Sequence, residues 1–332
     1  MPADRRTTRP TGLRRSSPDD PGIRRRRRGT GFSYRDDVTG WAPSATTRER
    51  IRGLAIPPAW RDVWICRDPS GHLQATGVDD AGRVQYLYHP EWRRRRDTAK
   101  FERMERFAAR LPAARRRVAR HLRDAGPTRR RALAAAFRIL DRGCIRVGSE
   151  QYARDGGGIG AATLRRTDVA LDGDRVRLAF TGKSGVAQEV ELRDRRLAAA
   201  LRPMLERGGR RRTGRLLAYE DDDEWHGLRS SDINDYVHDT VGEGFSAKDF
   251  RTWHATVAAR DALVRHEAPA SARERARGRR EAAEAAAAEL GDTPAVALRA
   301  YVDPRVIEDF ERGDLEDARA GEGPALDGLA GG

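Results

Sequence analysis

The stretch LGDTPAVALRAYVDP, residues 290–304, follows a long segment rich in Ala, Glu and Arg. That segment opens at residues 271–274 with the Ser and Glu of a capping box, which predicts the start of a helix. Gly291 is the residue type that ends a helix in the left-handed conformation, and Pro294 favours the first turn of another helix. We therefore expect Tyr301 about two turns into this second helix.

Charge and cysteine content narrow the class of protein. The 332-residue chain carries a formal net charge of +14, which favours a polyanionic partner. Cys66 and Cys144 are too few for a disulfide framework and form no metal-ligand motif, so we expect a reducing compartment. The apolar runs are too short to cross a membrane, and the arginine-rich start lacks the apolar core of a signal peptide. These features predict a cytoplasmic nucleic-acid-binding protein that does not enter a membrane.

Composition predicts four regions and an α+β fold. Residues 1–30 contain ten arginines and few large apolar side chains, so we expect a disordered basic arm. Such an arm is either a solvated tail or a source of sequence-independent affinity for phosphate backbones. Residues 31–98 are expected to form a small β-rich domain and residues 99–313 a larger, mainly helical domain. Residues 314–332 are expected to be a flexible acidic and glycine-rich tail.

The β-rich region contains two predicted strands, residues 72–78 and 83–89. Period-two alternation separates the faces of the second strand. One face of the strand would carry cationic and polar side chains, and the other would carry aromatic side chains. The alternative is an ordinary sheet whose tyrosines lie in the core. The two faces carry Arg83, Gln85, Leu87 and His89, and Val84, Tyr86 and Tyr88.

Two glycine-containing segments resemble nucleotide-binding loops, but neither has the neighbouring strand, helix or residues that such a loop requires. The cluster at residues 155–160 has no preceding strand and no acidic ribose partner, so a flexible connector is expected. In residues 182–184, Gly-Lys-Ser resembles the end of a phosphate loop, but Arg177 stands where the first glycine belongs and no helix follows. We expect a β-hairpin with Lys183 at its tip, where a lysine is either solvated or a mobile proton donor.

An amphipathic helix is predicted from Lys248, with Phe250, Trp253, Val257 and Val264 on one stripe. Lys248 and Arg251 are three residues apart and would project from a common side near its N-terminus. Since helix N-termini attract anions, the pair would make a phosphate site. His254 lies beside the apolar stripe and is interpreted as structural.

These motifs together resemble the type IB DNA topoisomerases of the small poxvirus-like kind found in bacteria. The resemblance rests on the order of Arg146, Lys183 on a hairpin, Lys248-Asp249-Phe250-Arg251, Leu290-Gly291-Asp292-Thr293-Pro294 and Tyr301. Residues 73–77 and 82–88 are similar to the family's N-terminal DNA-clamping domain. The likeness spans about residues 31–310.

The resemblance implies a β-rich clamp and a mainly helical catalytic domain with its lysine on a hairpin. It implies that Tyr301 attacks DNA to form a 3′-phosphotyrosyl link, that Arg146 and Arg251 grip the phosphate, and that Lys183 protonates the leaving 5′-oxygen. The free strand then rotates and is resealed without ATP, metal or another cofactor. The partner is double-stranded DNA, held by a monomeric clamp. The expected DNA contacts are Arg83, Gln85, Tyr86, Tyr88, Tyr152 and Lys248.

Asp292 departs from the family, which usually has a hydrogen-bond-donating histidine or asparagine at this position. An ionised aspartate only accepts hydrogen bonds and would repel a phosphate oxygen. On that interpretation Asp292→Asn cleaves DNA faster, with a gain that shrinks as the pH falls. The carboxyl could instead be protonated, bridge through water, or hold Arg146 or Arg251 in an ion pair, in which case the variant is slower.

Two other functions compete with this one. Tyrosine recombinases share the chemistry, but their N-terminal domain is usually helical, and the expected histidine just before Arg251 is absent here. A non-enzymatic nucleoid-binding protein would account for the basic charge, but not for Tyr301 together with Arg146, Lys183 and Arg251. Supercoil relaxation by the wild type and by Tyr301→Phe distinguishes the three functions.

Overall fold

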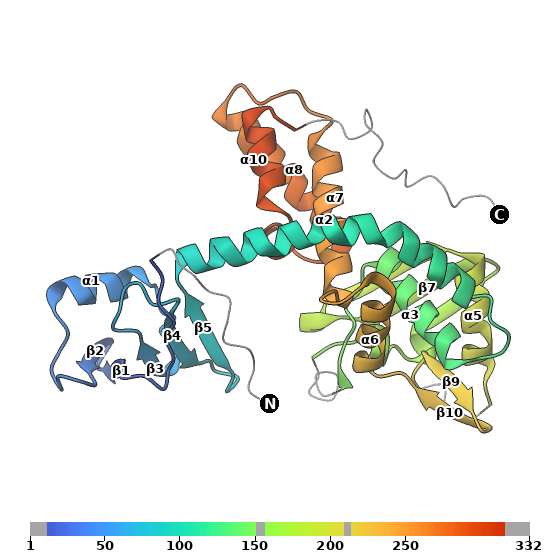
Figure 1. The fold of residues 1–332 in the computed structure, drawn as a ribbon, viewed down its shortest axis with the longest axis horizontal. Coiled ribbons are helices and arrows are strands. Elements are labelled where there is room, and N and C mark those ends of the chain that lie inside the picture. Colours follow the sequence, from blue (N-terminus) through green and yellow to red (C-terminus); the bar gives the residue numbers. More distant parts are fainter. Residues whose placement is uncertain (1–11, 151–156, 209–213, 316–332) are drawn as a thin grey trace. The chain divides into compact units, whose positions relative to one another are not determined.

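The computed structural model describes residues 12–150, 157–208 and 214–315 (Figure 1). The chain forms two compact units, Met1–Phe101 and Glu102–Gly332. The division lies within a few residues of the expected boundary between the β-rich and helical domains. Helix α2 (Pro90–His121) crosses the division.

The N-terminal unit is built on a five-stranded antiparallel sheet with the strand order β2-β1-β3-β4-β5. Its core contains Ile23, Val63, Ile65 and Ala75 from the sheet and Ile51 from the helix. The last two strands lie where the alternation predicted them. The strands are β1 (Ile23–Arg28), β2 (Gly31–Asp36), β3 (Arg61–Ile65), β4 (Leu73–Val78) and β5 (Val84–Tyr88), and the helix is α1 (Ala45–Gly53).

The prediction of a disordered basic arm is wrong for residues 12–30, the part of the arm that the structure describes. Its arginine run is strand β1, which pairs with both β2 and β3. Ile23 is 1% exposed, and the Arg25 guanidinium donates to the carbonyl oxygens of Ile56, Pro57 and Trp60. Period-two alternation lets the other arginines remain in solvent, so the run forms a strand despite its charge.

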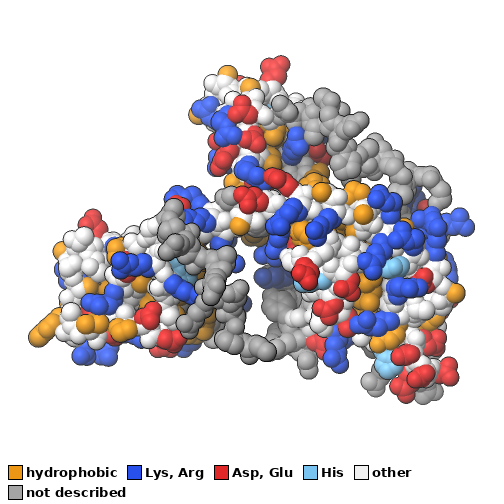
Figure 2. Space-filling view, viewed as in Figure 1, with side chains coloured by type: hydrophobic (Ala, Val, Ile, Leu, Met, Phe, Trp, Pro, Cys, Tyr) orange, Lys and Arg blue, Asp and Glu red, His pale blue; other side chains and the backbone are white. Residues whose placement is uncertain are grey.

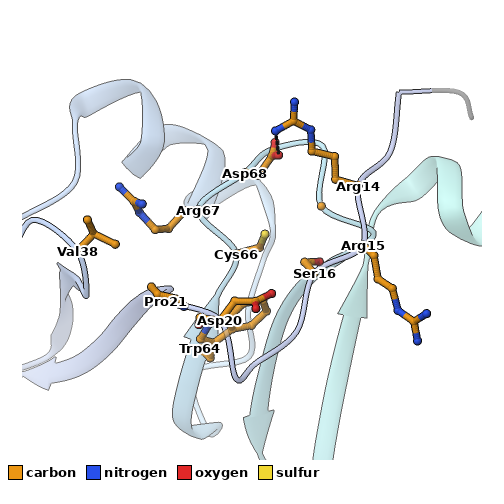
Figure 3. Close-up of a pocket in the computed structure, with 11 residues that line it drawn as sticks. Arg14, Arg15, Ser16, Asp20, Pro21, Val38, Trp64, Cys66, Arg67 and Asp68 are labelled. Atoms are coloured by element: carbon orange, nitrogen blue, oxygen red, sulfur yellow. Dashed lines mark hydrogen bonds and ion pairs between the residues drawn. The ribbon is translucent and has the colours of Figure 1, made fainter. Parts of the chain in front are cut away.

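The segment before β1 is also ordered against the sheet. The Trp64 indole N–H donates to the Asp20 carbonyl over 3.0 Å, and the Ser16 hydroxyl donates to the Leu73 carbonyl over 2.9 Å. Figure 3 shows that residues 14–16 and 20–21 line a pocket together with Trp64 and Cys66. Residues 1–11 lie outside the described residues.

Strand β5 has the two faces that its alternation predicted. Tyr86 is 51% exposed and stacks on Tyr88, with ring centroids 6.2 Å apart. Leu87 packs on the core, and Gln85 donates to the Asp79 carboxylate. Tyr88 packs partly against the second small apolar cluster of this unit. The alternative that places both tyrosines in the core is therefore wrong for Tyr86.

The second unit is mainly helical, with a three-stranded antiparallel sheet in the order β6-β7-β8 and a separate β9-β10 ribbon (Figure 1). Strands β7 and β8 form the predicted hairpin. The helices after α2 are α3 (Arg129–Gly143), α5 (Arg195–Glu206), α6 (Ser230–Val241), α7 (Ala247–Leu263), α8 (Ala272–Leu290), α9 (Pro294–Ala300) and α10 (Pro304–Arg312). The strands are β6 (Val169–Asp172), β7 (Arg175–Thr181), β8 (Ala187–Arg193), β9 (Ala218–Asp221) and β10 (Glu224–Gly227).

Aromatic packing holds α3 and α7 together in this unit. The Phe137 ring meets the Phe250 ring edge-on with centroids 4.9 Å apart, and Phe107 of α2 contacts Phe250 at 5.1 Å. Helix α7 also packs against α8, so it is buried on more than one side. For that reason the predicted stripe is only partly right: Phe250 is buried, whereas Trp253 and Val257 are half-buried.

The glycine cluster was expected to be a flexible connector, and its described residues, 157–160, show instead a close backbone approach. A Cβ on Gly158, whose φ is +94°, would lie 2.2 Å from the Gly182 carbonyl oxygen. The Ile159 N–H donates to the Thr181 carbonyl over 2.8 Å. Glycine is needed here because the segment lies directly against the hairpin that carries Lys183.

Strand β1 supports a test by truncation. Deleting residues 2–30 removes the strand between β2 and β3 together with buried Ile23, so we expect the N-terminal unit to lose its cooperative thermal unfolding transition. Deleting residues 2–11 leaves every described strand in place and serves as the control. Circular dichroism melting of both proteins measures the difference. An unchanged transition in the longer deletion would contradict the structural role of β1.

Candidate active site

Three chain segments meet at the site, and each is positioned by the end of a helix. Helix α3 ends at Cys144, whose φ of 51° turns the chain so that Arg146 follows. Arg251 lies in the second turn of α7. Helix α8 ends at Gly291, whose φ of 60° is the predicted left-handed cap, and Asp292 comes directly after it.

The Asp292 carboxylate bridges the two arginines. The Arg146 guanidinium donates to both carboxylate oxygens, over 2.8 Å and 2.9 Å, and Arg251 donates to Oδ2 over 2.6 Å. The side chain of Arg251 is only 3% exposed, and it also donates to the carbonyl oxygens of Cys144 and Leu290. The ion pair that the alternative interpretation expected is therefore present, and the charge of the carboxylate is compensated from two sides.

Tyr301 lies beside these guanidinium groups. It is the C-cap of α9 and not an interior helical residue as expected, because the helix ends at Ala300. Its ring centroid is 5.0 Å from the Arg251 guanidinium carbon. Burial raises the pKa of the phenol, but Arg251 and Arg146 outweigh this effect, so the net pKa is lowered. A lowered pKa increases the fraction of nucleophilic phenolate.

Thr256 and Asp303 hold the backbone around Tyr301, and the sequence interpretation missed both. The Thr256 hydroxyl contacts the Tyr301 carbonyl at 3.2 Å and accepts from the Asp303 N–H at 3.2 Å. The Asp303 carboxylate caps α10, which begins with Pro304. Asp followed by Pro is a helix-start signal that could have identified the second of these residues.

Lys183 lies at the hairpin tip, as predicted, and is exposed. The hairpin is tied to the Asp292 turn, since the Gln188 amide of β8 donates to the Gly291 carbonyl over 3.0 Å. On the other side, the Ala161 N–H donates to the Arg146 carbonyl over 2.8 Å. The first bond holds the hairpin next to the Asp292 turn, and the second holds Arg146 next to the glycine-rich segment that contacts the hairpin at Thr181. The lysine itself is exposed.

Lys248 does not join Arg251 in one phosphate site, contrary to expectation. Lys248 is exposed, whereas Arg251 is buried. The N-terminus of α7 is already capped by Asp249, which accepts from the Ser246 N–H over 2.8 Å and pairs with Arg103. Of the other expected DNA contacts, Tyr152 lies outside the described residues.

Basic side chains gather on the surface of the catalytic unit. Figure 2 shows Lys and Arg along α2 and over the adjoining elements of this unit. Within the unit, exposed arginines on α2 are Arg106, Arg110, Arg116, Arg117 and Arg120. Such a surface attracts the phosphate backbone of a nucleic acid without regard to its sequence.

A phenol beside two guanidinium groups is the arrangement used by enzymes that attack phosphodiesters with a tyrosine. The comparisons with known proteins agree with this class. The family described as "Eukaryotic DNA topoisomerase I, catalytic core" matches residues 89–312, and "Bacterial DNA topoisomerase IB, N-terminal domain" matches residues 31–79. "DNA topoisomerase 1B" of Acanthamoeba polyphaga mimivirus is 28% identical over 294 residues, covering 87% of this chain and 88% of the viral protein.

The chain therefore belongs to the type IB DNA topoisomerase family. It is an enzyme that relaxes supercoiled DNA by cleaving one strand through a 3′-phosphotyrosyl intermediate, allowing rotation and resealing the strand without ATP or a metal ion. The family match favours this activity over the recombinase and the non-enzymatic alternatives. Among the described residues, no helix is long and apolar enough to span a bilayer.

The bridge from Asp292 reverses the expected effect of Asp292→Asn. The amide removes the negative charge that compensates both guanidinium groups and replaces one acceptor oxygen by an NH₂ group, so Arg146 no longer donates to two oxygens and both arginines lose their ionic partner. Since a hydrogen bond to a charged group contributes about 1.5–3 kcal/mol, we expect single-turnover cleavage at neutral pH to be slower by roughly tenfold or more. Asp309→Asn, which removes a carboxylate from α10, is the matched control. A faster Asp292→Asn enzyme would restore the repulsion hypothesis.

Proposed function

We propose that Tyr301 is the nucleophile of the strand-cleavage step, and the observation that carries this assignment is its place beside Arg251 and Arg146. The phenolate oxygen attacks the scissile phosphorus, the bond to the 5′-oxygen breaks, and the 3′-phosphate stays on the tyrosine. The lowered pKa of Tyr301 supports this role, because the charges that stabilise the phenolate also face the incoming phosphate. Thr256 acts as a positioning residue through the Tyr301 carbonyl.

Arg146 and Arg251 stabilise the charge that develops on the non-bridging oxygens. Guanidinium groups suit this task because they remain charged and their planar donors match the geometry of phosphate oxygens. Asp292 is a positioning residue that holds both groups at one point before DNA arrives. A preorganised donor costs no reorganisation at the moment of reaction, which is the source of its effect on rate.

Lys183 is the proton donor for the leaving 5′-oxygen. An exposed lysine on an anchored hairpin can move toward bound DNA while its base remains fixed to Gly291 through Gln188. Charge stabilisation by Arg146 and Arg251 is thus separate from proton transfer by the exposed lysine side chain.

Double-stranded DNA is the substrate, and the N-terminal unit is proposed to clamp it. Exposed Tyr86 and half-buried Tyr88 form a stacked pair that offers apolar and hydrogen-bonding contacts, with Gln85 on the same strand and Arg83 directly before it. One chain carries the whole catalytic set, so we propose that a monomer acts on DNA, without a membrane or small-molecule partner, in the cytoplasm at the nucleoid. Lys248 and Tyr152 remain proposed DNA contacts.

Relaxation of plasmid DNA tests the function. We expect the purified protein to relax positive and negative supercoils with EDTA present and ATP absent, and Tyr301→Phe to abolish relaxation while retaining DNA binding. Tyr219→Phe is a matched control, because it removes a phenol hydroxyl on β9 that the mechanism does not use. An absolute requirement for magnesium or ATP, or full activity of Tyr301→Phe, would refute the mechanism.

A modified substrate tests Lys183 separately. Lys183→Ala should cleave ordinary DNA about 10²–10⁴-fold more slowly, as is typical when a general acid is lost. Because a thiolate leaves without needing a proton, a substrate with a 5′-thiol leaving group should restore most of the lost rate. Arg251→Ala should not be rescued by the same substrate. Equal defects of Lys183→Ala on both substrates would remove this residue from the acid role.

A further inference from the structure

Three potential metal ligands lie close together in the catalytic unit. The Cys144 thiol, a ring nitrogen of His254 and a carboxylate oxygen of Glu289 all lie within 4.8 Å of one another. They come from the C-terminal end of α3, from α7 and from the last turn of α8, three helices that are labelled in Figure 1. The reaction described above uses none of these side chains, and the sequence interpretation expected no metal ligands.

The ligand types and their spacing suit a tetrahedral zinc-like ion. Cys144 Sγ lies 3.2 Å from Glu289 Oε1, and His254 Nδ1 lies 3.9 Å from the same oxygen. Zinc bonds of about 2.0–2.3 Å place tetrahedral ligand atoms roughly 3.4–3.6 Å apart. Small side-chain rotations therefore suffice to form the site.

His254 also has the outer hydrogen-bond partner that a metal-binding histidine requires. Its Nε2 lies 3.4 Å from Asp141 Oδ1. The buried Asp141 carboxylate is itself held by the Arg115 guanidinium over 2.7 Å and 2.9 Å. Donation of the Nε2–H to this carboxylate leaves the Nδ1 lone pair directed at the cluster, as in carboxylate–histidine–zinc arrangements.

The site has an open side and a balanced charge. The Glu289 side chain is 42% exposed and the His254 side chain is 16% exposed. An ion can therefore enter beside them, together with a water molecule that serves as its fourth ligand. The Cys144 thiolate and the Glu289 carboxylate offset the two charges of the ion, while Arg115 is paired with Asp141 and Arg251 with Asp292. Binding releases the thiol proton to solvent.

We propose that Cys144, His254 and Glu289 form a binding site for a thiophilic divalent cation such as Zn²⁺, separate from the transesterification chemistry. Cys144 lies two residues before Arg146, His254 three after Arg251, and Glu289 three before Asp292. An ion bound here cross-links the three segments that position the catalytic charges, so it stabilises the catalytic unit.

Cobalt provides the spectroscopic test, with the metal-free full-length protein as the sample. We expect one equivalent of Co²⁺ to produce a thiolate charge-transfer band and the intense visible bands of a tetrahedral ion, both of which Zn²⁺ abolishes. Cys144→Ser should remove the charge-transfer band, and Glu289→Gln should weaken binding at least tenfold. Cys66→Ser, which changes the other buried free cysteine, is the matched control and should behave as the wild type.

Thermal unfolding provides an independent readout. At a Zn²⁺ concentration about a hundredfold above the dissociation constant, the midpoint should rise by roughly 5–10 °C in the wild type and in Cys66→Ser. At the same Zn²⁺ concentration the rise should fall by about half or more in Glu289→Gln, a substitution at a side chain that is 42% exposed. Absence of the charge-transfer band in folded wild-type protein, or equal bands in Cys144→Ser and wild type, would overturn the proposal.

Discussion

The carboxylate bridge from Asp292 to Arg146 and Arg251 is the interaction on which the rest of the site depends. Two guanidinium groups brought together in a largely buried place repel each other, and desolvation adds to that cost. One carboxylate accepting from both groups compensates the repulsion and fixes their separation. Two backbone carbonyls complete the environment of Arg251, although its Nε has no protein partner among the described residues. The charges that later meet a phosphate are thus already assembled.

Helix ends bring this bridge together. Cys144 and Gly291 are C-caps in the left-handed conformation, and each turns the chain so that a charged side chain follows. Gly291 serves a second purpose, since a Cβ there would lie 2.2 Å from the Gln188 amide oxygen and would displace the amide that donates to the Gly291 carbonyl. Tyr301 is itself a helix C-cap. Catalytic groups at helix ends can be aimed independently, while the packed helices behind them remain rigid.

Helix boundaries and the order of catalytic residues were predictable because their signals are local. The capping box at residues 271–274, the Gly291 cap and Pro294 at the start of α9 all lie where the sequence placed them. The hairpin that carries Lys183 was predicted from the alternation in its two strands and from the turn residues between them. The arginine run was misinterpreted because composition alone cannot show that Arg25 finds three carbonyl partners, which a distant loop supplies.

The sequence by itself determined most of the helices and strands, the types of the proposed catalytic residues and, through the order of its motifs, the family. Only the tertiary structure decided which charged groups share an environment. It paired Asp292 with both arginines, left Lys248 in solvent and brought Cys144, His254 and Glu289 together from three helices. The physical reason is that capping and periodicity act over a few residues, whereas charge compensation and metal ligation depend on contacts between residues 35 to 146 positions apart.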